Sequence, residues 1–333
     1  MKNNRSDKYR SPAKAIITGV SDLFRRHERV GEIKPTDRLD GKKVLITGAS
    51  SGLGFAVARQ LAERGATVIM ACRSGIPGKG EEIAHMTGSN DVHMVHVDLA
   101  DSDSIVRMVG EVKKRFGAID IFISSAGIVA RKGRKTKLGP DEMFVVNYLA
   151  PFVLVNLLLK EELIGRPGYG TARMIFVSSE THRNPKAFGW EGFGRFRTYG
   201  MSRSVELYGY YKLLLTTFVN ELSRRLNAGG HVRYSIFALC PGPINSNIAR
   251  EAPALIQLLL KVIFKLFFRS PEKAAGPVVY LSVSPDMEGK ALDYLFLMSR
   301  KEMDPKATDP ANGKRLWELT EKLFMTGTYP SIP

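Results

Sequence analysis

Short runs of β-branched and apolar residues alternate with longer stretches in which apolar residues return every three or four positions. The short runs predict strands and the longer stretches predict amphipathic helices. The strands are expected at residues 44–47, 67–71, 92–97, 119–124, 173–178, 233–239 and 292–297. Runs such as IFIS and MIFVSS are apolar almost throughout, which is typical of parallel strands covered by helices on both faces. The pattern therefore predicts an α/β fold with one doubly wound parallel sheet of about seven strands flanked by helices.

The same pattern divides the chain into three parts. Residues 1–40 form a basic N-terminal extension, in which apolar residues between Ala13 and Phe24 recur at helical spacing and predict an amphipathic helix. Residues 41–325 are expected to form the α/β domain. Residues 326–333 are left as a short tail.

One segment inside the domain is unusually apolar. Residues 254–268 contain hardly any polar positions except Gln257, Lys261 and Lys265, which lie four residues apart. A helix of this length reaches only about 22 Å, which is too short to cross a bilayer comfortably. The segment 244–270 is therefore predicted to be either a helix at a membrane surface or a lid over a substrate.

Composition and charge limit the partners. The chain has 333 residues, of which 44% are hydrophobic, which is enough to bury the core of one large domain. Its formal net charge of +16 favours an anionic partner, such as a phosphate-bearing cofactor, an acidic lipid or a nucleic acid. No nucleic-acid-binding module or aromatic stacking platform accompanies the charge, so we do not expect nucleic acid.

Cysteine content and hydropathy bear on location. Cys72 and Cys240 are the only cysteines, so neither a disulfide framework nor a cysteine-based metal site is expected. No window is expected to reach the roughly 20 uninterrupted apolar residues of a membrane-spanning helix, and the N-terminus is polar rather than signal-like. The expected location is the cytoplasm, with peripheral contact at a membrane as a further option.

A glycine-rich turn joins the first predicted strand to a helix. It contains Gly48, Ser50, Ser51, Gly52, Leu53 and Gly54. Glycines let a backbone turn tightly and approach a pyrophosphate, and the N-terminus of the following helix presents unpaired N–H groups. Such a turn is typical of Rossmann-type dinucleotide sites, although a glycine-rich turn without a ligand is the alternative. The turn predicts a dinucleotide cofactor.

The residue after the second strand bears on which dinucleotide binds. A fold that prefers NAD usually has an acidic residue here, which binds the ribose hydroxyls. This chain has Arg73, whose guanidinium suits a 2′-phosphate. NADP(H) is therefore the expected cofactor and NAD(H) the less favoured one, while the alternative for Arg73 is a side chain that only faces solvent.

Tyr208 and Lys212 are four positions apart and share one face of a predicted helix. A free phenol has a pKa near 10, which is too high for ready proton exchange at neutral pH. A neighbouring ammonium group and a positively charged nicotinamide ring both favour the phenolate and are expected to lower this pKa. Tyr208 is therefore predicted to act as the acid or base. Tyr210 and Tyr211 are poorer candidates, because neither has a lysine four residues on.

The order of these motifs resembles that of the short-chain dehydrogenase/reductase family over about residues 40–325. The matching motifs are the TGxxxGxG turn, Asp98-Leu99, Ser125-Ala126-Gly127, Tyr208 with Lys212, and Pro241-Gly242. The ACR sequence after strand two, the VSSETHR sequence at 177–183 and the late LWE sequence look most like retinol dehydrogenase-like and WW-domain-containing-oxidoreductase-like members. No WW domain precedes the catalytic part.

The resemblance implies contacts for the cofactor. Asp98 and Leu99 match the pair that contacts the adenine, although Asp98 is equally able to cap the helix expected from about residue 102. Where the family usually has two asparagines before Ala-Gly, this chain has Ser124 and Ser125. Hydrogen bonds that normally brace this turn are therefore expected to be missing. The turn at 241–242 matches the one beside the nicotinamide.

The resemblance also implies the chemistry, which is hydride transfer between the nicotinamide and a carbonyl or alcohol carbon without a metal. Ser179 matches the hydroxyl that holds the substrate oxygen, and we prefer it to Ser178 because the second serine of the pair is usually the catalytic one. Asn147 matches the asparagine that holds a water in the proton relay from Lys212. Its alternative role is a polar residue that bends its helix.

The remaining expectations concern substrate and partners. Residues 180–206 separate Ser179 from Tyr208 by more than is usual in the family, and their aromatic and basic residues predict a flap over the site. The resemblance implies a lipophilic substrate, such as a retinal-like, fatty aldehyde or steroid-like compound. A homodimer through the helices that contain Asn147 and Tyr208 is a further option. The rival function is a cofactor-binding regulatory or interaction protein with little turnover.

Overall fold

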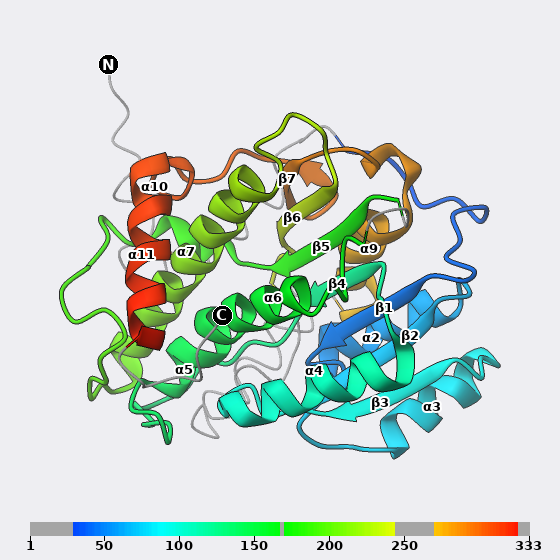
Figure 1. Ribbon diagram of the computed structural model, residues 1–333, viewed down its shortest axis with the longest axis horizontal. Coiled ribbons are helices and arrows are strands. Elements are labelled where there is room, and N and C mark those ends of the chain that lie inside the picture. Colours follow the sequence, from blue (N-terminus) through cyan, green and yellow to red (C-terminus); the bar gives the residue numbers. More distant parts are fainter. Residues whose placement is uncertain (1–28, 167–169, 244–269, 326–333) are drawn as a thin grey trace.

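The computed structural model describes residues 29–166, 170–243 and 270–325. Within them, eight strands form one sheet in the order β3-β2-β1-β4-β5-β6-β7-β8 (Figure 1). The strands are β1 (Lys43–Thr47), β2 (Thr67–Cys72), β3 (Val92–His96), β4 (Ile121–Ser124), β5 (Ala172–Val177), β6 (Tyr234–Cys240), β7 (Leu292–Phe296) and β8 (Ser299–Arg300). Neighbours from β3 to β7 pair in parallel, and β8 is antiparallel to β7. The predicted doubly wound α/β sheet is confirmed.

Helices cover both faces of the sheet. They are α2 (Gly52–Ala62), α3 (Gly78–Thr87), α4 (Ser102–Phe116), α5 (Glu142–Phe144), the π-helical turn η2 (Val145–Leu149), α6 (Ala150–Lys160), α7 (Met201–Leu226), α9 (Pro271–Val283), α10 (Pro305–Thr308) and α11 (Pro310–Met325), with short 3₁₀ turns η3 (Glu180–Arg183) and η5 (Pro285–Met287). Buried residues of α2, α3 and α9 form the core on one face. Those of α4, α6, α7 and α11 form the core on the other (Figure 1).

The predicted strands differ from the observed ones by one or two residues at their ends, and one observed strand was not expected at all. The strand predicted to begin at Ile119 begins two residues later, because the Ile119 amide donates to the carbonyl of Leu163, outside the sheet. The antiparallel strand β8 has only two residues, too few to show an alternating pattern. It extends the sheet without changing the parallel arrangement that precedes it.

The continuous helix over Glu142–Lys160 corrects the expectation that no stretch is apolar enough to span a membrane. Its length and its mean hydropathy of 1.8 are sufficient for a span, but 78% of the apolar window is buried inside the protein. Phe152, for example, packs against the rings of Phe218 and Trp317 at centroid distances of 5.2 and 4.9 Å. The apolar composition of this helix is thus explained by its position in the core.

The C-terminal helix α11 packs against α7 (Figure 1). Trp317 lies between Phe152 of α6 and Arg225 of α7, whose guanidinium carbon is 4.2 Å from the indole centroid. The hydroxyl groups of Tyr148 and Thr320 are 2.5 Å apart and fully buried. The helix therefore completes the core on this side.

Three predicted segments lie partly or wholly outside the described residues. They are the amphipathic N-terminal helix, the apolar stretch at 254–268 and the tail at 326–333.

Candidate active site

A cavity of about 700 Å³ runs along the carboxyl ends of the parallel strands, where β1 and β4 meet at the switch point of the sheet. Its walls include every residue that the sequence predicted for the cofactor and also Ser179. These are Gly48, Ser50, Ser51, Gly52, Leu53, Gly54, Arg73, Asp98, Leu99, Ser125, Ala126, Gly127, Ser179, Tyr208, Lys212, Pro241 and Gly242. Residues far apart in the sequence meet here because parallel strands end at the same edge of the sheet.

The turn from β1 to α2 has a backbone that side chains would obstruct. Gly48 has a φ of +71°, and a Cβ atom on it would lie 2.7 Å from the Cα atom of Ala126. A Cβ atom on Gly54 would lie 2.3 Å from the carbonyl oxygen of Gly48. Helix α2 then begins after Ser51 without a side-chain cap and without an acidic residue in its first turn. Its N-terminal amides and its positive dipole end are thus available to an anionic group in the cavity.

The turn after β4 is braced differently from what the family resemblance implies. The amide of Ala126 donates to Thr47 Oγ1 over 3.5 Å, so a residue of β1 supplies one contact to this turn. Thr47 was missed by sequence reasoning, although it is the first residue of the glycine-rich motif. The hydroxyl of Ser125 is buried and has no hydrogen-bond partner within the described protein. A polar ligand in the cavity would satisfy it.

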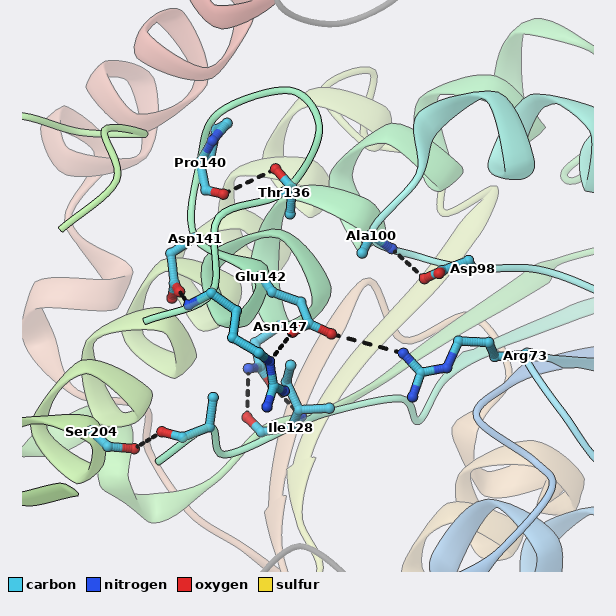
Figure 2. A network of polar contacts seen from close by, with 12 residues as sticks. Arg73, Asp98, Ala100, Ile128, Thr136, Pro140, Asp141, Glu142, Asn147 and Ser204 are labelled. Atoms are coloured by element: carbon cyan, nitrogen blue, oxygen red, sulfur yellow. Dashed lines mark hydrogen bonds and ion pairs between the residues drawn. The ribbon is translucent and has the colours of Figure 1, made fainter. Parts of the chain in front are cut away.

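Arg73 extends from the end of β2 toward the start of α5 (Figure 2). Its Nη1 atom is 3.8 Å from Glu142 Oε1, and its side chain is 54% exposed. Glu142 also binds Arg134, so one carboxylate stands between two guanidinium groups at the cavity wall. This pairing of Arg73 was not foreseen, because 69 residues separate the two partners in the sequence.

Asp98 does not cap helix α4, which corrects one of the two roles considered for it. The cap is Asp101, whose Oδ1 atom accepts a hydrogen bond from the amide of Asp103 over 3.0 Å. Asp98 instead accepts from the amide of Ala100 over 3.0 Å, as Figure 2 shows. This contact fixes its carboxylate in the turn after β3, where it lines the cavity.

Lys212 is buried at the base of the cavity, on the same face of α7 as Tyr208. Its Nζ atom donates to the carbonyl of Val177, at the end of β5, over 2.8 Å. The same atom is 5.7 Å from the centroid of the Tyr208 ring. The ammonium group of Lys212 and the phenol of Tyr208 are therefore neighbours in the cavity.

Asn147 is fully buried behind the cavity wall, in the π-helical turn η2. Its amide nitrogen donates to the carbonyls of Ile128 and Met143 over 2.8 and 2.9 Å, and its oxygen accepts from the amide of Ile128 over 3.2 Å. Both amide hydrogens are used, so any water of a proton relay would have to donate to an acceptor here. A Cβ atom on Gly127 would be 3.0 Å from the Asn147 oxygen and 3.6 Å from Lys212 Nζ.

The two serines after β5 face different neighbours. The hydroxyl of Ser178 is buried and lies 2.7 Å from Thr216 Oγ1. The hydroxyl of Ser179 lies close enough to Tyr208 to counter part of the rise in the pKa of the phenol, and it also accepts from the amide of Thr181 over 3.3 Å. Of the two serines, Ser179 is the one that faces the phenol of Tyr208.

Burial dominates the effect of the protein's own groups on the pKa of Tyr208. Burial raises the pKa of this phenol, and the hydrogen bond from Ser179 only partly offsets the effect. Burial also lowers the pKa of Lys212 from 10.5 to about 8. Desolvation thus disfavours both charged forms, and a positive charge brought into the cavity would favour the phenolate.

Beyond β6, the turn of Pro241 and Gly242 closes the cavity. Gly242 has a φ of +80°, and a Cβ atom on it would lie 2.6 Å from the side chain of Leu297. Both cysteines of the chain, Cys72 and Cys240, also line the cavity at strand ends. Burial raises the pKa of both thiols, that of Cys240 to about 12, so they are uncharged at neutral pH.

The segment expected to form a flap is held against the helical layer. Phe193 makes an edge contact with Phe144 at 5.4 Å, and Phe188 stacks on Trp190 at 4.4 Å. None of the described residues that line the cavity comes from 180–206, and the last part of this range begins helix α7. Burial of the aromatic side chains explains the packing of Phe193 on the helical layer.

The sequence matches known proteins along most of its length. The family profile of short chain dehydrogenases matches residues 42–191. Retinol dehydrogenase 14 from Homo sapiens is 31% identical over 302 residues, which cover 85% of this chain and 86% of that protein. Retinol dehydrogenase 12 from Mus musculus is 32% identical over 298 residues, which cover 86% of this chain and 87% of that protein.

Solved structures also resemble this chain in fold. The structure of an uncharacterized protein from Mycobacterium paratuberculosis has a TM-score of 0.66 and 29% identity, and the match covers 89% of this chain and 96% of that one. A gluconate 5-dehydrogenase from Beutenbergia cavernae, solved with bound NADP, shares the fold with a TM-score of 0.58 and 23% identity over 78% of this chain and 96% of that one.

The predicted likeness to retinol dehydrogenase-like proteins is therefore confirmed. So is the predicted reaction class, which is NAD(P)-dependent dehydrogenation of CH–OH groups. The chain belongs to the short-chain dehydrogenase/reductase family.

Proposed function

We propose that this protein transfers hydride between NADP(H) and a lipophilic carbonyl or alcohol, with Tyr208 as the acid or base. One observation carries the proposal: Tyr208, Lys212 and the Ser179 hydroxyl meet in the same cavity as the glycine-rich turn of α2. The dinucleotide would be held by this turn, by Asp98 and Leu99, and by the turn of Pro241 and Gly242. The open N-terminus of α2 and the unpartnered Ser125 hydroxyl fit such a ligand.

Each catalytic side chain then has a distinct task. The bound cofactor supplies or accepts the hydride. Tyr208 gives its phenolic proton to the substrate oxygen in reduction and takes it back in oxidation. The Ser179 hydroxyl holds the same oxygen and keeps it near the phenol. The ammonium group of Lys212 favours the phenolate of Tyr208 between these steps.

Asn147 acts one layer behind these groups. Its side chain joins helix η2 to the turn at Ile128, and only Gly127 separates its oxygen from Lys212 Nζ. We assign Asn147 the role of holding this turn beside the lysine. Its carbonyl oxygen is the side-chain atom that a water of the proton relay would contact.

A lipophilic substrate is proposed on the likeness to the retinol dehydrogenases. The test is NADPH oxidation against retinal, medium-chain aldehydes and steroid ketones, followed by NADP⁺ reduction with the matching alcohols. We expect turnover with at least one of these lipophilic pairs and little with short polar carbonyls. Uniform inactivity together with firm cofactor binding would favour a regulatory or interaction protein instead.

The preference for NADP(H) is proposed because of Arg73. Glu142 is expected to weaken the binding of NADP(H). The Glu142 carboxylate stands 3.8 Å from the guanidinium and would repel a 2′-phosphate bound there. Glu142→Gln removes this charge and keeps the shape, so the Kd of NADPH should fall about fivefold, which corresponds to roughly 1 kcal/mol. The Kd of NADH should change little.

Glu111→Gln is the matched control, because Glu111 pairs with Arg115 on α4 and does not line the cavity. It should leave both dissociation constants unchanged. Weaker binding of NADPH to Glu142→Gln would contradict the role of Glu142. Equal or tighter binding of NADH than of NADPH to the wild-type protein would contradict the cofactor assignment itself.

A further inference from the structure

The short helix η3, directly after Ser179, is tied to a distant segment of the chain. Glu180 binds Lys301 and accepts a hydrogen bond from the hydroxyl of Tyr294 over 2.7 Å. Arg183 donates to the carbonyl of Glu302. Residues 301–302 thereby hold in place the part of the chain that directly follows strand β5. Neither contact reaches the cavity, so their effect on the site must pass through the backbone of Ser179.

His182 is the residue of η3 that contacts Ser179 itself. Its side chain is fully buried, and its Nδ1 atom is 2.7 Å from the carbonyl oxygen of Ser179. Its Nε2 atom lies 3.2 Å from the amide nitrogen of Asp304, which can only donate. Nε2 is therefore the acceptor, and the proton of the neutral ring is on Nδ1 and points at the Ser179 carbonyl.

Electrostatics agree with this neutral ring. Burial is the main reason why the pKa of His182 is lowered from 6.5 to about 4, and the nearby Arg183 adds to the effect. Glu180 and Asp304 act in the opposite direction but do not outweigh burial. At neutral pH, His182 thus keeps one donor and one acceptor, which is the combination that its two partners need.

The carbonyl of Ser179 is held twice by the same residue, because the backbone amide of His182 also donates to it over 3.1 Å. On the other side, the hydroxyl of Ser178 is fixed by Thr216. The backbone is therefore constrained both before and after the Ser179 side chain. The Ser179 side chain, whose hydroxyl acts on the phenol of Tyr208, leaves from this backbone.

We propose that His182 is a positioning residue: by joining the Ser179 carbonyl to the Asp304 amide, it fixes the backbone from which the Ser179 hydroxyl meets Tyr208 and the substrate oxygen. This inference rests on the proposed function of Ser179 and Tyr208. It assigns the 301–304 segment, which is more than 100 residues from Ser179 in sequence, a part in the alignment of the site.

Two substitutions separate the two hydrogen bonds of the ring. The amide of an asparagine reaches about as far as Nδ1, so His182→Asn can still donate to Ser179 but loses the contact with Asp304. His182→Gln can extend its oxygen toward the Asp304 amide but loses the donor to Ser179. We expect the glutamine variant to lose about a hundredfold in kcat, because displacement of a reacting group by 1 Å has effects of this size.

The asparagine variant should have a kcat much nearer that of the wild type, and KM should change less than kcat in both variants. Tyr148→Phe is the matched control for stability, since it removes a buried hydroxyl that contacts Thr320 of α11, and neither residue lines the cavity. It should lower the Tm without lowering kcat. Equal losses of kcat in the asparagine and glutamine variants would overturn the proposal.

Crystal structures of the same two variants test the inference without any substrate. The Ser179 hydroxyl should keep its contact with Tyr208 in His182→Asn and be displaced from it in His182→Gln. An unmoved hydroxyl in the glutamine variant would refute the positioning role. If instead the wild-type protein turns over no compound of the substrate panel, the proposed function fails, and these structures still decide whether His182 positions Ser179.

Discussion

Tyr208→Phe is expected to reduce kcat by about a thousandfold or more, because proton transfer by a positioned group contributes factors of this order and no other described phenol lines the cavity. The substitution removes one oxygen atom and leaves the ring in place. The Kd of NADPH, measured by fluorescence or calorimetry, should therefore stay close to that of the wild type.

Tyr210→Phe is the matched control for this prediction. Tyr210 is on the same helix, but its hydroxyl donates to the carbonyl of Gly189 over 3.1 Å and does not line the cavity. Its loss should leave kcat unchanged. Retained turnover in Tyr208→Phe, with the substrate that the wild-type protein prefers, would refute the assignment of Tyr208 as the acid or base.

Lys212→Met is expected to inactivate the protein and, at the same time, to stabilise its fold at neutral pH. Burial lowers the pKa of Lys212 from 10.5 to about 8, which corresponds to about 3 kcal/mol of desolvation cost. The lost hydrogen bond to Val177 offsets about 1 kcal/mol of the gain. The expected net gain in the free energy of unfolding is thus about 2 kcal/mol, and chemical denaturation at pH 7 measures it.

The pH dependence of this gain has a definite sign. Below pH 8 the ammonium is charged in both the folded and the unfolded chain, so the full cost of burying it weighs on the wild-type fold. Between pH 8 and 10.5 only the folded protein has lost the proton, and the wild-type fold becomes more stable as pH rises. The advantage of the variant should shrink over this range.

Lys314→Met provides the comparison, because Lys314 is 74% exposed and carries no comparable burial cost. Its unfolding free energy should follow that of the wild type at every pH. A destabilised Lys212→Met variant at pH 7 would show that the contacts of the lysine outweigh its desolvation.

The sequence predicted the sheet, and the grouping of its motif residues at one edge of the sheet, for a physical reason. Parallel strands are short apolar runs, and each ends in the residues that face the ligand, so motif and position coincide in the sequence. Gly48, Asp98 and Gly127 were recognisable in this way. Membrane contact, the homodimer and the use of NADP(H) stay predictions.

Contacts between distant segments were not predictable in the same way. Glu142 pairs with Arg73 and His182 with Asp304 only because the fold brings together loops that share no periodic pattern. The sequence shows the cation near Tyr208 but not the depth of burial, which raises the pKa of the phenol. The packing of Phe193 on Phe144 was also not predictable, because aromatic residues bury themselves wherever the fold offers an apolar surface.

Helix α11 has a consequence for self-association. It contacts α6 and α7, the helices through which a second copy of the chain was expected to pair, and Trp317 and Phe324 cover part of Phe152. These apolar surfaces are thus already covered within one chain. A second copy of the chain that used the same apolar patch would first have to displace α11 from it.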